Sequence, residues 1–440
     1  MAIDLKTVAV ISLGCPKNLT DTEVMLGQLI EAGYEIVPAT ELEAINAEVL
    51  LINTCAFLES ARSEAYQTIT AGIKLKHKKQ VNKIVIAGCL PVYDRQKLQE
   101  HWPEIDLVIG PAEVYKLAAF LEKSKINYQV GNLKYNLLPA NRVVTTAGSA
   151  YLKIAEGCDN HCSFCTIPRL RGPYRSKPKE VILAEAKTLV QAGIKEIVLV
   201  AQDTTGYGKD ISGKLELAEL LKELSQIKKI EWIRVMYAYP MHITKELIKV
   251  MAGEEKICKY LDIPLQHIDD EILKSMQRQA TEAATRKVID ELKNKIPELA
   301  LRTTLIVGYP GEQNRHFEKL LKFVEESKFA RLGVFTYSRE EGTSAAKKRD
   351  QVAEEVKKQR FDKLMRLQNR ISEEQNKMFI GKELDVLIES ASRGRSFRDA
   401  PEIDGCVHLD KTKHAISPGD MVKVQITRSD SYDLGGKMVT

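Results

Sequence analysis

Three cysteines lie close together in the middle of the chain, in the segment Glu-Gly-Cys-Asp-Asn-His-Cys-Ser-Phe-Cys: Cys158, Cys162 and Cys165. Thiolates at this CxxxCxxC spacing can bind three irons of a 4Fe–4S cluster and leave the fourth iron without a protein ligand. An open iron suits a cluster that must bind a small molecule. The alternatives are a structural zinc site and chance clustering. Zinc knuckles usually take a second Cys pair or His partners at fixed offsets, and no second pair follows here.

Three more cysteines each follow a predicted strand in the N-terminal part of the chain: Cys15, Cys55 and Cys89. The carboxyl ends of parallel strands share one edge of a sheet, and ligands bind at that edge. Residues far apart in the sequence can therefore converge there. The pattern predicts a second three-cysteine cluster with one open iron. Buried structural cysteines are the alternative, because Cys is among the most buried residue types.

Continuous apolar strands that alternate with helices predict a parallel, doubly wound sheet for residues 5–121. The expected strands are Thr7–Leu13, Glu48–Asn53, Lys83–Ala87 and Leu107–Ile109, and the expected helices are Asp21–Ala32, Ser60–Leu75 and Tyr93–Glu100. Residues 122–143, which have weak periodicity, are predicted to be a linker.

A second αβ series predicts a partial (βα)6 TIM-like barrel over residues 144–375. Its expected strands are Tyr151–Glu156, Glu196–Gln202, Trp232–Tyr237, Tyr260–Pro264, Leu301–Gly308 and Leu332–Tyr337. The CxxxCxxC loop follows the first of these strands, so it lies at the face where such barrels have their active sites. A charged helix, Ala353–Met378, ends the series. Short alternating strands then predict a small antiparallel β-barrel over residues 378–440.

Composition and termini place the chain in the cytoplasm. No apolar run reaches the roughly 18 residues that a membrane span needs, and the N-terminus lacks the regions of a signal peptide. The eight cysteines of this 440-residue chain therefore indicate metal or catalytic sites rather than disulfides. The net charge of +5 neither requires nor excludes a nucleic-acid partner.

These motifs resemble the methylthiotransferase branch of the radical S-adenosylmethionine (SAM) superfamily, and the resemblance covers nearly the whole chain. Asp-Ile-Pro-Leu-Gln-His (262–267) and Val-Gly-Tyr-Pro-Gly-Glu (307–312) are wordings that this branch shares. The resemblance implies an N-terminal domain with an auxiliary 4Fe–4S cluster on Cys15, Cys55 and Cys89. It implies a radical-SAM 4Fe–4S cluster on the CxxxCxxC cysteines, SAM as cofactor, and a C-terminal TRAM domain.

The substrate indicated by this resemblance is a protein. Ser-Leu-Gly-Cys-Pro-Lys-Asn (12–18), Val-Ala-Gln-Asp-Thr-Thr-Gly-Tyr-Gly (200–208) and Tyr-Ala-Tyr-Pro (237–240) are similar to the members that modify small-subunit ribosomal protein S12. Members that modify tRNA usually read Gly-Cys-Gln-Met-Asn or Gly-Cys-Lys-Val-Asn at the first motif. Residues 381–440 hold nine Lys/Arg and ten Asp/Glu, which makes a poor RNA clamp. A MiaB-like tRNA methylthiotransferase is the main alternative. An iron–sulfur carrier or scaffold with two clusters and a zinc-dependent nucleic-acid-binding protein are the others.

The implied reaction adds a β-methylthio group to an aspartate. A 5′-deoxyadenosyl radical, formed from SAM at the reduced barrel cluster, removes a hydrogen from Cβ. Sulfur then comes from the auxiliary cluster and the methyl group from a second SAM. Such chemistry needs a cofactor-derived radical, because the carbon–hydrogen bond is unactivated. An external donor such as flavodoxin or ferredoxin supplies electrons. The expected substrate is the ribosomal protein, free or in the small subunit, and we expect a monomeric enzyme with no membrane partner.

Residues at the ends of the barrel strands are candidates for the remaining contacts. The candidates for SAM contact are Gln202, Asp203, Gln266, Val307 and Gly308, and the candidates for substrate contact are Tyr207, Arg169 and Arg171. For the strand-end polar residues the alternative is an ordinary capped turn. Cys258 and Cys406 have no partners of matching spacing, so no function is predicted for either.

Overall fold

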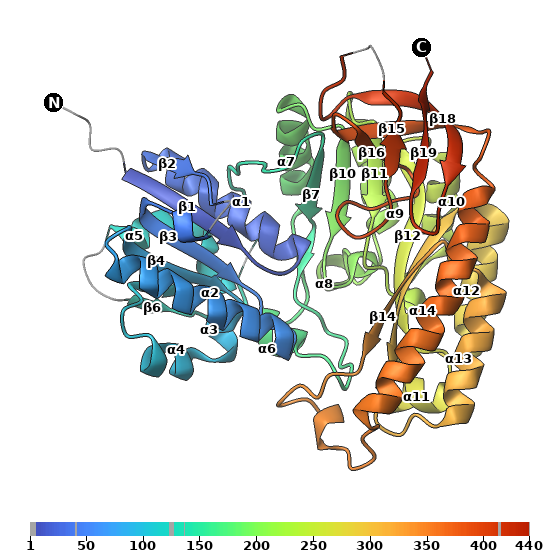
Figure 1. Ribbon diagram of the computed structural model, residues 1–440, viewed down its shortest axis with the longest axis horizontal. Coiled ribbons are helices and arrows are strands. Elements are labelled where there is room, and N and C mark those ends of the chain that lie inside the picture. Colours follow the sequence, from blue (N-terminus) through green and yellow to red (C-terminus); the bar gives the residue numbers. More distant parts are fainter. Residues whose placement is uncertain (1–5, 40–41, 123–126, 136, 412–414, 440) are drawn as a thin grey trace. The chain divides into compact units, whose positions relative to one another are not determined.

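The computed structural model of the chain describes residues 6–39, 42–122, 127–135, 137–411 and 415–439 (Figure 1). It divides into two compact units. Unit 1 comprises residues 1–145, 155–160 and 165–177, and unit 2 comprises residues 146–154, 161–164 and 178–440. Some residues of the predicted domains and linker, namely 5, 40–41, 123–126, 136, 412–414 and 440, lie outside the described part.

Unit 1 contains a six-stranded parallel sheet with the strand order β2-β1-β3-β4-β5-β6. Its strands are β1 (Lys6–Ser12), β2 (Tyr34–Val37), β3 (Ala47–Thr54), β4 (Val81–Gly88), β5 (Leu107–Ile109) and β6 (Asn127–Gln129). The predicted doubly wound sheet is confirmed. The sequence analysis missed β2 and β6, which are short edge strands of four and three residues without a continuous apolar run.

Helices cover both faces of this sheet because its central strands are apolar on both sides. Every residue of β3 except Glu48 is buried, and two separate apolar clusters form, one on each face. The helices are α1 (Pro16–Glu31), α2 (Glu59–His77), α3 (Leu90–Tyr93), α4 (Arg95–His101) and α5 (Leu117–Leu121), with 3-10 turns η1 (Leu42–Ala44) and η2 (Pro111–Lys116). Unit 1 also holds the antiparallel pair β8 (Ala155–Glu156) and β9 (Arg175–Ser176), and α6 (Ile167–Arg171).

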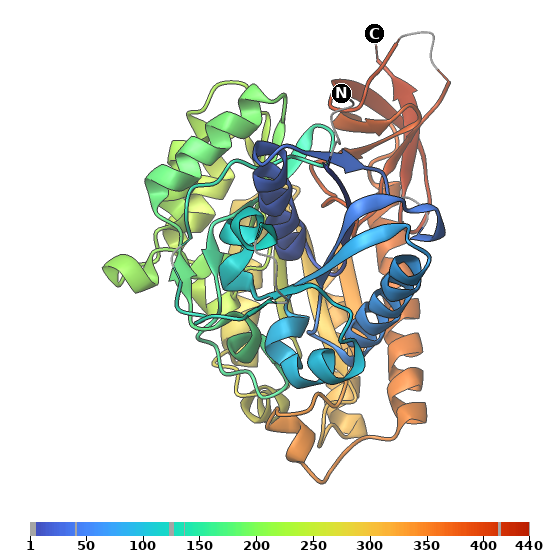
Figure 2. The same ribbon diagram turned by 90° about the vertical axis from the view of Figure 1, so that its left-hand side faces the viewer.

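Unit 2 contains a second parallel sheet with the order β14-β13-β12-β11-β10-β7, which confirms the six predicted barrel strands. Its strands are β7 (Ser149–Lys153), β10 (Glu196–Val200), β11 (Trp232–Val235), β12 (Ile257–Gln266), β13 (Ala300–Val307) and β14 (Arg331–Thr336). The helices are α7 (Lys179–Gln191), α8 (Lys209–Ser212), α9 (Leu217–Ser225), α10 (Lys245–Gly253), α11 (Asp270–Ser275), α12 (Glu282–Lys295), α13 (Asn314–Ser327) and α14 (Glu354–Lys377), with turns η3 (Thr204–Gly206), η4 (Pro240–His242) and η5 (Ala345–Lys347). The colours from green to orange follow this alternation in Figure 2.

The C-terminal residues form a closed five-stranded barrel with the order β15-β16-β17-β19-β18. Its strands are β15 (Glu383–Ser390), β16 (Arg393–Ser396), β17 (Val407–Leu409), β18 (Met421–Ser429) and β19 (Leu434–Met438), drawn in red in Figures 1 and 2. The predicted small β-barrel is confirmed. Strands β16 and β19 were missed because Arg-Gly-Arg-Ser and Leu-Gly-Gly-Lys-Met lack the apolar alternation that marks a strand.

Buried ion pairs join this small barrel to the amino-terminal ends of the unit 2 strands. Glu196, the first residue of β10, lies 2.7 Å from Arg234 of β11 and 2.6 Å from Arg395 of β16, and all three side chains are buried. Tyr260 of β12 donates to Asp404 at 2.8 Å. The opposite, carboxyl-terminal ends of the strands are therefore the ones left for a site. Among the described helices, none combines the length and the apolar character that a membrane crossing needs.

Candidate functional site

The three N-terminal cysteines lie at one edge of the unit 1 sheet. Cys15 follows β1, Cys55 follows β3 and Cys89 follows β4, and these three strands are direct neighbours in the sheet. The strand register pairs Ser12 with Asn53 and Thr54 with Gly88, so the strands also end level with one another. The sequence-based prediction that these cysteines share a sheet edge is confirmed.

Two glycines let the cysteine loops approach each other. Gly14 and Gly88, each directly before a cysteine, have φ of +94° and +96°. A Cβ at Gly14 would lie 2.6 Å from the Cβ of Cys55, and a Cβ at Gly88 would overlap the carbonyl oxygen of Thr54. Both positions therefore require glycine for two reasons, the left-handed backbone and the close contact.

Asn18 of α1 ties the same loops together. Its buried side-chain amide donates to the carbonyls of Leu13 at 3.0 Å and Thr54 at 2.8 Å. The Asn53 amide in turn donates to the Asn18 carbonyl at 2.8 Å. The loops after β1 and β3 are thus held by hydrogen bonds that do not involve the thiols. Asn18 also contacts one thiol, because Cys89 Sγ lies 4.0 Å from its Oδ1.

Burial of two of these thiols favours their protonated form, so a metal that binds there must displace a proton. Burial, together with the neighbouring thiols Cys55 and Cys15, raises the pKa of Cys89 to about 12, against a lowering by Arg171. Burial also raises the pKa of Cys55.

Arg171, a candidate for substrate contact, is buried beside the N-terminal cysteines. Its side chain, expected to face a substrate, is 2% exposed. Its Nε donates to Cys89 Sγ at 3.1 Å, and its Nη1 donates to Asp21 at 2.7 Å and to Glu156 at 3.2 Å. Its Nη2 contacts Asn18. A buried guanidinium in hydrogen-bond contact with a thiol stabilises the thiolate that a metal needs.

The CxxxCxxC loop belongs partly to each unit: Cys158 and Cys165 are in unit 1, and Cys162 is in unit 2. In unit 1, the amide of Asn160 donates to Cys158 Sγ at 3.4 Å, and the amide of Ile167 donates to Cys165 Sγ at 3.5 Å. The Cys158 amide is itself bound by the Gly172 carbonyl at 3.1 Å. Backbone amides aimed at sulfur are suited to a thiolate that carries negative charge.

In unit 2, the middle of this loop is anchored to the parallel barrel. The Ser163 amide donates to the Met276 carbonyl at 2.9 Å, and its hydroxyl lies 2.7 Å from the hydroxyl of Tyr309. Phe164 packs against an apolar cluster that includes Tyr309 and Tyr337. Arg278 Nη1 lies within hydrogen-bond reach of Cys162 Sγ at 3.8 Å. The sequence identifies Met276 and Arg278 only as a pair that the methylthiotransferase branch shares, because the proximity of Arg278 to Cys162 arises only in the folded chain.

Gln266 is the candidate SAM contact that the structure supports most. It ends β12 with φ of +72°, and its buried Oε1 has no hydrogen-bond partner among the described residues. A buried acceptor without a donor is destabilising unless a ligand supplies one. The next residue, His267, accepts from the Asp269 amide at 3.0 Å, and burial lowers its pKa to about 3. The lowered pKa favours the neutral imidazole, which accepts through Nδ1 and carries its proton on Nε2.

The other strand-end candidates have structural partners. Asp203 accepts from the Gly206 amide at 3.1 Å and pairs with His242 at 2.8 Å. A Cβ at Gly308, where φ is +73°, would overlap the Lys357 side chain, so this position favours glycine. Gln202 is half-buried, and Val307 and Tyr207 are buried.

Arg169 lies on α6 close to the thiol-binding Arg171 but in a different environment. It is exposed, and its guanidinium stacks over the Tyr93 ring at 4.4 Å. Arg62 approaches the same ring at 4.4 Å. Of the two α6 arginines, only Arg169 has the exposure that a substrate contact requires.

A parallel barrel with a CxxxCxxC loop after its first strand defines a radical SAM enzyme, and family comparisons agree. The model of the Radical SAM superfamily matches residues 152–324. The model described as uncharacterized protein family UPF0004 matches residues 7–110, and that of the TRAM domain matches residues 380–439. A radical SAM enzyme carries a 4Fe–4S cluster and binds SAM.

Relatives that match along nearly the whole chain identify the family more specifically than the models of its separate domains do. The chain is 44% identical to "Ribosomal protein uS12 methylthiotransferase RimO" of Citrifermentans bemidjiense, with 98% of each chain covered. It is 45% identical to the protein of the same name from Geotalea uraniireducens and 46% identical to that from Elusimicrobium minutum, with at least 98% of each chain covered. The chain belongs to this RimO family of radical SAM methylthiotransferases.

Solved structures share the fold at low sequence identity. The radical SAM methyltransferase TsrM from Kitasatospora setae is similar with a TM-score of 0.57 at 12% identity, covering 76% of this chain and 75% of that one. The cobalamin-dependent radical enzyme OxsB is similar with a TM-score of 0.51 at 14% identity, covering 84% of this chain and 56% of that one. At such identities these structures establish the architecture and not the substrate.

Proposed function

We propose that the chain adds a β-methylthio group to an aspartate of ribosomal protein uS12, in the cytoplasm. The observation that carries this proposal is the similarity along 98% of the chain to proteins named for uS12 methylthiotransfer. The two sets of three cysteines give the proposal its chemistry. The tRNA alternative has no such support among these relatives, and the C-terminal barrel lacks the excess of basic residues that RNA binding favours.

In this proposal Cys158, Cys162 and Cys165 hold the radical-SAM 4Fe–4S cluster, and SAM binds the remaining iron. When bound, that cluster supplies the electron that cleaves SAM and so generates the radical. Residues of the chain place hydrogen-bond donors beside the cysteine sulfurs of the loop. The amides of Asn160 and Ile167 face two of the sulfurs, and Arg278 lies beside the third. Positive partial and full charges at all three sulfurs stabilise the thiolate form.

Cys15, Cys55 and Cys89 hold a second, auxiliary 4Fe–4S cluster, where the sulfur to be transferred is kept. Two features support this proposal: the three thiols meet at one sheet edge, and Arg171 donates to one of them. Arg171 therefore positions and polarises a ligand of this cluster, and its burial makes it a weaker candidate for substrate contact than Arg169. Its carboxylate partners Asp21 and Glu156 fix its orientation, since each accepts from the same Nη1.

Roles for the remaining candidates follow from their surroundings. We propose that Gln266 accepts a hydrogen bond from SAM, because its buried Oε1 has no partner among the described residues. Gln202, Asp203, Val307 and Gly308 would shape the same mouth of the barrel. Arg169 is the candidate for contact with the protein substrate, because it is exposed.

Tyr207 is a weaker candidate for substrate contact, because its side chain is 2% exposed. We further propose that the chain acts as a monomer. An external low-potential donor such as flavodoxin or ferredoxin reduces it. Its substrate is uS12, either free or in the small ribosomal subunit.

Anaerobic turnover tests the function directly. Reconstituted, reduced protein receives SAM, sulfide and either uS12, small ribosomal subunits or hypomodified tRNA, and every substrate is analysed by mass spectrometry. We expect a gain of about 46 Da, one methylthio group replacing one hydrogen, on an aspartate-bearing uS12 peptide. Comparing free uS12 with the assembled subunit identifies the substrate form.

The control variant is Cys258→Ala, which removes a buried thiol of β12 outside both cysteine sets. It should retain turnover. A gain on tRNA instead of uS12 would overturn the substrate assignment and leave the radical chemistry intact. Uncleaved SAM and unmodified substrates, with both clusters loaded, would refute the enzyme assignment.

A further inference from the structure

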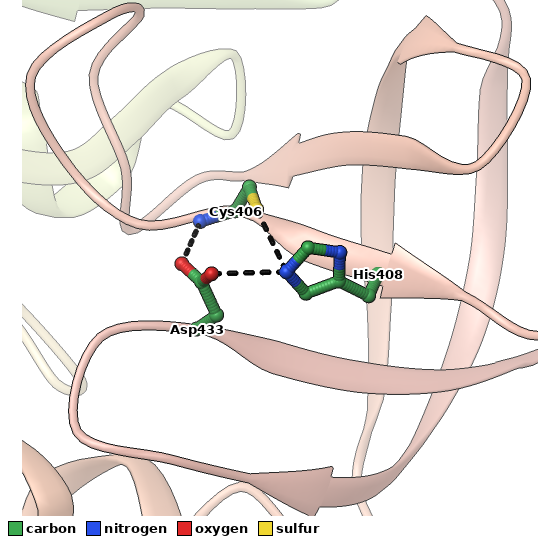
Figure 3. Close-up of side chains that lie close together, drawn as sticks. All are labelled: Cys406, His408 and Asp433. Atoms are coloured by element: carbon green, nitrogen blue, oxygen red, sulfur yellow. Dashed lines mark hydrogen bonds and ion pairs between the residues drawn. The ribbon is translucent and has the colours of Figure 1, made fainter.

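A separate cluster of metal-ligating side chains lies in the C-terminal barrel, apart from both proposed iron–sulfur sites. Cys406, His408 and Asp433 each offer one ligand atom, and these atoms lie within 4.8 Å of one another (Figure 3). The Cys406 sulfur is 3.4 Å from His408 Nε2, and Asp433 Oδ2 is 2.9 Å from the same nitrogen. From the sequence we had predicted no function for Cys406, since Asp433 is far away along the chain.

Strand geometry explains why these side chains meet. Cys406 directly precedes β17 and His408 is the second residue of that strand, so in extended backbone their side chains project from the same face. Strand β19 runs parallel to β17 with Val407 opposite Leu434. Continued by one residue, that register places Asp433, which directly precedes β19, opposite Cys406. The pairing of β17 with β19 therefore brings the three side chains together.

The carboxylate is oriented by the backbone. Asp433 Oδ1 accepts from the Cys406 amide at 2.9 Å, which turns Oδ2 toward the imidazole. The turn before it is also fixed, because Asp430 Oδ1 accepts from the Asp433 amide at 2.8 Å. Supporting hydrogen bonds of this kind, which hold a ligand in the binding orientation, are typical of protein metal sites.

The arrangement differs from a Cys–His–Asp catalytic triad. In such a triad the nucleophile and the carboxylate engage opposite nitrogens of the imidazole ring. Here the thiol and the carboxylate both approach Nε2. Three ligand atoms that converge on one point are what a metal ion would bridge.

We propose that Cys406, His408 and Asp433 form a three-ligand site for one zinc ion, with the fourth coordination position open to solvent. Tetrahedral zinc places sulfur and imidazole nitrogen about 3.5 Å apart, and nitrogen and oxygen about 3.3 Å apart. The observed separations differ from these values by less than about half an ångström. One thiolate and one imidazole select zinc over magnesium or calcium, which prefer ligand sets made only of oxygen.

The charges also fit a divalent cation. A thiolate and a carboxylate together neutralise Zn²⁺, and binding releases the thiol proton to solvent. Among the described residues, no lysine or arginine forms an ion pair with Asp433. The other three-ligand group, Asp269, Glu271 and His316, differs in this respect: Lys319 pairs with Asp269 and Arg315 with Glu271. His408 is half-exposed, so the ion can enter from solvent.

Zinc loading of the full chain tests the proposal. Protein with its iron–sulfur clusters reconstituted is dialysed against ZnCl₂ and desalted, and its zinc content and Zn K-edge X-ray absorption are measured. We expect one zinc per chain, with one sulfur and otherwise nitrogen or oxygen ligands. Cys406→Ser and His408→Ala should each weaken zinc binding by at least about tenfold. Asp410→Asn, which changes a carboxylate of the same barrel that pairs with Arg428, is the matched control and should bind normally.

Three results would overturn the proposal. The wild type could bind no more zinc than the double variant Cys406→Ser/His408→Ala. The bound zinc could have no sulfur ligand. The sulfur signal could persist in Cys406→Ser, which would place the ion on other cysteines. Unchanged thermal unfolding of the variants without zinc would exclude misfolding as the cause of lost binding.

Discussion

Replacing Arg171 tests the proposed auxiliary site most sharply. The variant Arg171→Met keeps the length of the side chain and removes its charge. It thereby deletes the hydrogen bond from Nε to Cys89 Sγ, which measures 3.1 Å. Removing a cation beside the cluster disfavours the reduced state, which carries one more negative charge. The reduction potential of the N-terminal cluster should therefore fall.

The magnitude follows from the contact. A hydrogen bond to a charged group contributes about 1.5–3 kcal/mol, which is about 65–130 mV for a one-electron couple. The oxidised cluster also has anionic thiolates and keeps part of this stabilisation. We expect about half of the full value, a decrease of roughly 30–65 mV.

The same variant should lose stability, because it leaves buried carboxylates without a partner. Asp21 and Glu156 are 3% and 0% exposed and both pair with Arg171. Breaking a buried ion pair by removing one partner costs about 3–5 kcal/mol. Thermal unfolding of the cluster-free protein measures this loss separately from the potential.

The assay is a redox titration followed by electron paramagnetic resonance, in a background where the CxxxCxxC cysteines are alanine so that one cluster remains. Arg169→Met is the matched control, since Arg169 lies on the same helix and stacks on Tyr93. It should leave the potential unchanged. Arg171→Lys retains the charge and should restore part of the potential. A loaded Arg171→Met protein with the wild-type potential would refute the assigned role of Arg171.

Three further predictions concern the cysteine sets and the buried ion pairs. Cys89→Ser should retain SAM cleavage and lose methylthio transfer, whereas Cys162→Ser should lose both; equal loss of cleavage in the two variants would contradict separate roles for the clusters. Gly14→Ala should lower the iron content by about one cluster, because its Cβ would lie 2.6 Å from a cysteine Cβ, while Gly33→Ala, at a similar φ with no atom within 4 Å, should load normally. Burial alone would raise the pKa of Glu196, but two buried guanidinium groups lower it to about 2. Its ion pairs therefore stabilise the fold fully above its unfolded pKa and are lost as the pH falls toward 2. Glu196→Gln should cost about 3 kcal/mol at pH 7 and progressively less below pH 4.5, as measured by chemical denaturation; a loss independent of pH would show that the charge is not responsible.

The strands that the sequence predicted are those with continuous apolar runs. The runs in Glu48–Asn53 and Lys83–Ala87 became β3 and β4, each with one or two further residues at its ends. The missed strands, β2, β6, β9, β16 and β19, are short and partly polar. Their conformation depends on pairing with a neighbour, which no local pattern reports.

The positions of the cysteines in the sequence identified them as candidate ligands. The side chains that surround them in the fold could not be predicted in this way. The rule that parallel strands share a carboxyl edge predicted that Cys15, Cys55 and Cys89 would converge. The rule did not indicate Arg171, which contacts Asp21 across 150 positions of sequence. From its place after the cluster loop, Arg171 read as an exposed basic residue. Only burial against three polar partners reveals its contact with Cys89.

The sequence by itself determined the class of chemistry and the order of the domains. Ligand spacing and the αβ periodicity are local properties that a linear pattern records directly. Tertiary structure decided which charges lie beside the thiols, which glycines allow close approach, and which strand pairing brings Cys406, His408 and Asp433 together. These depend on contacts between residues tens to hundreds of positions apart, because burial and strand register exist only once the chain has folded.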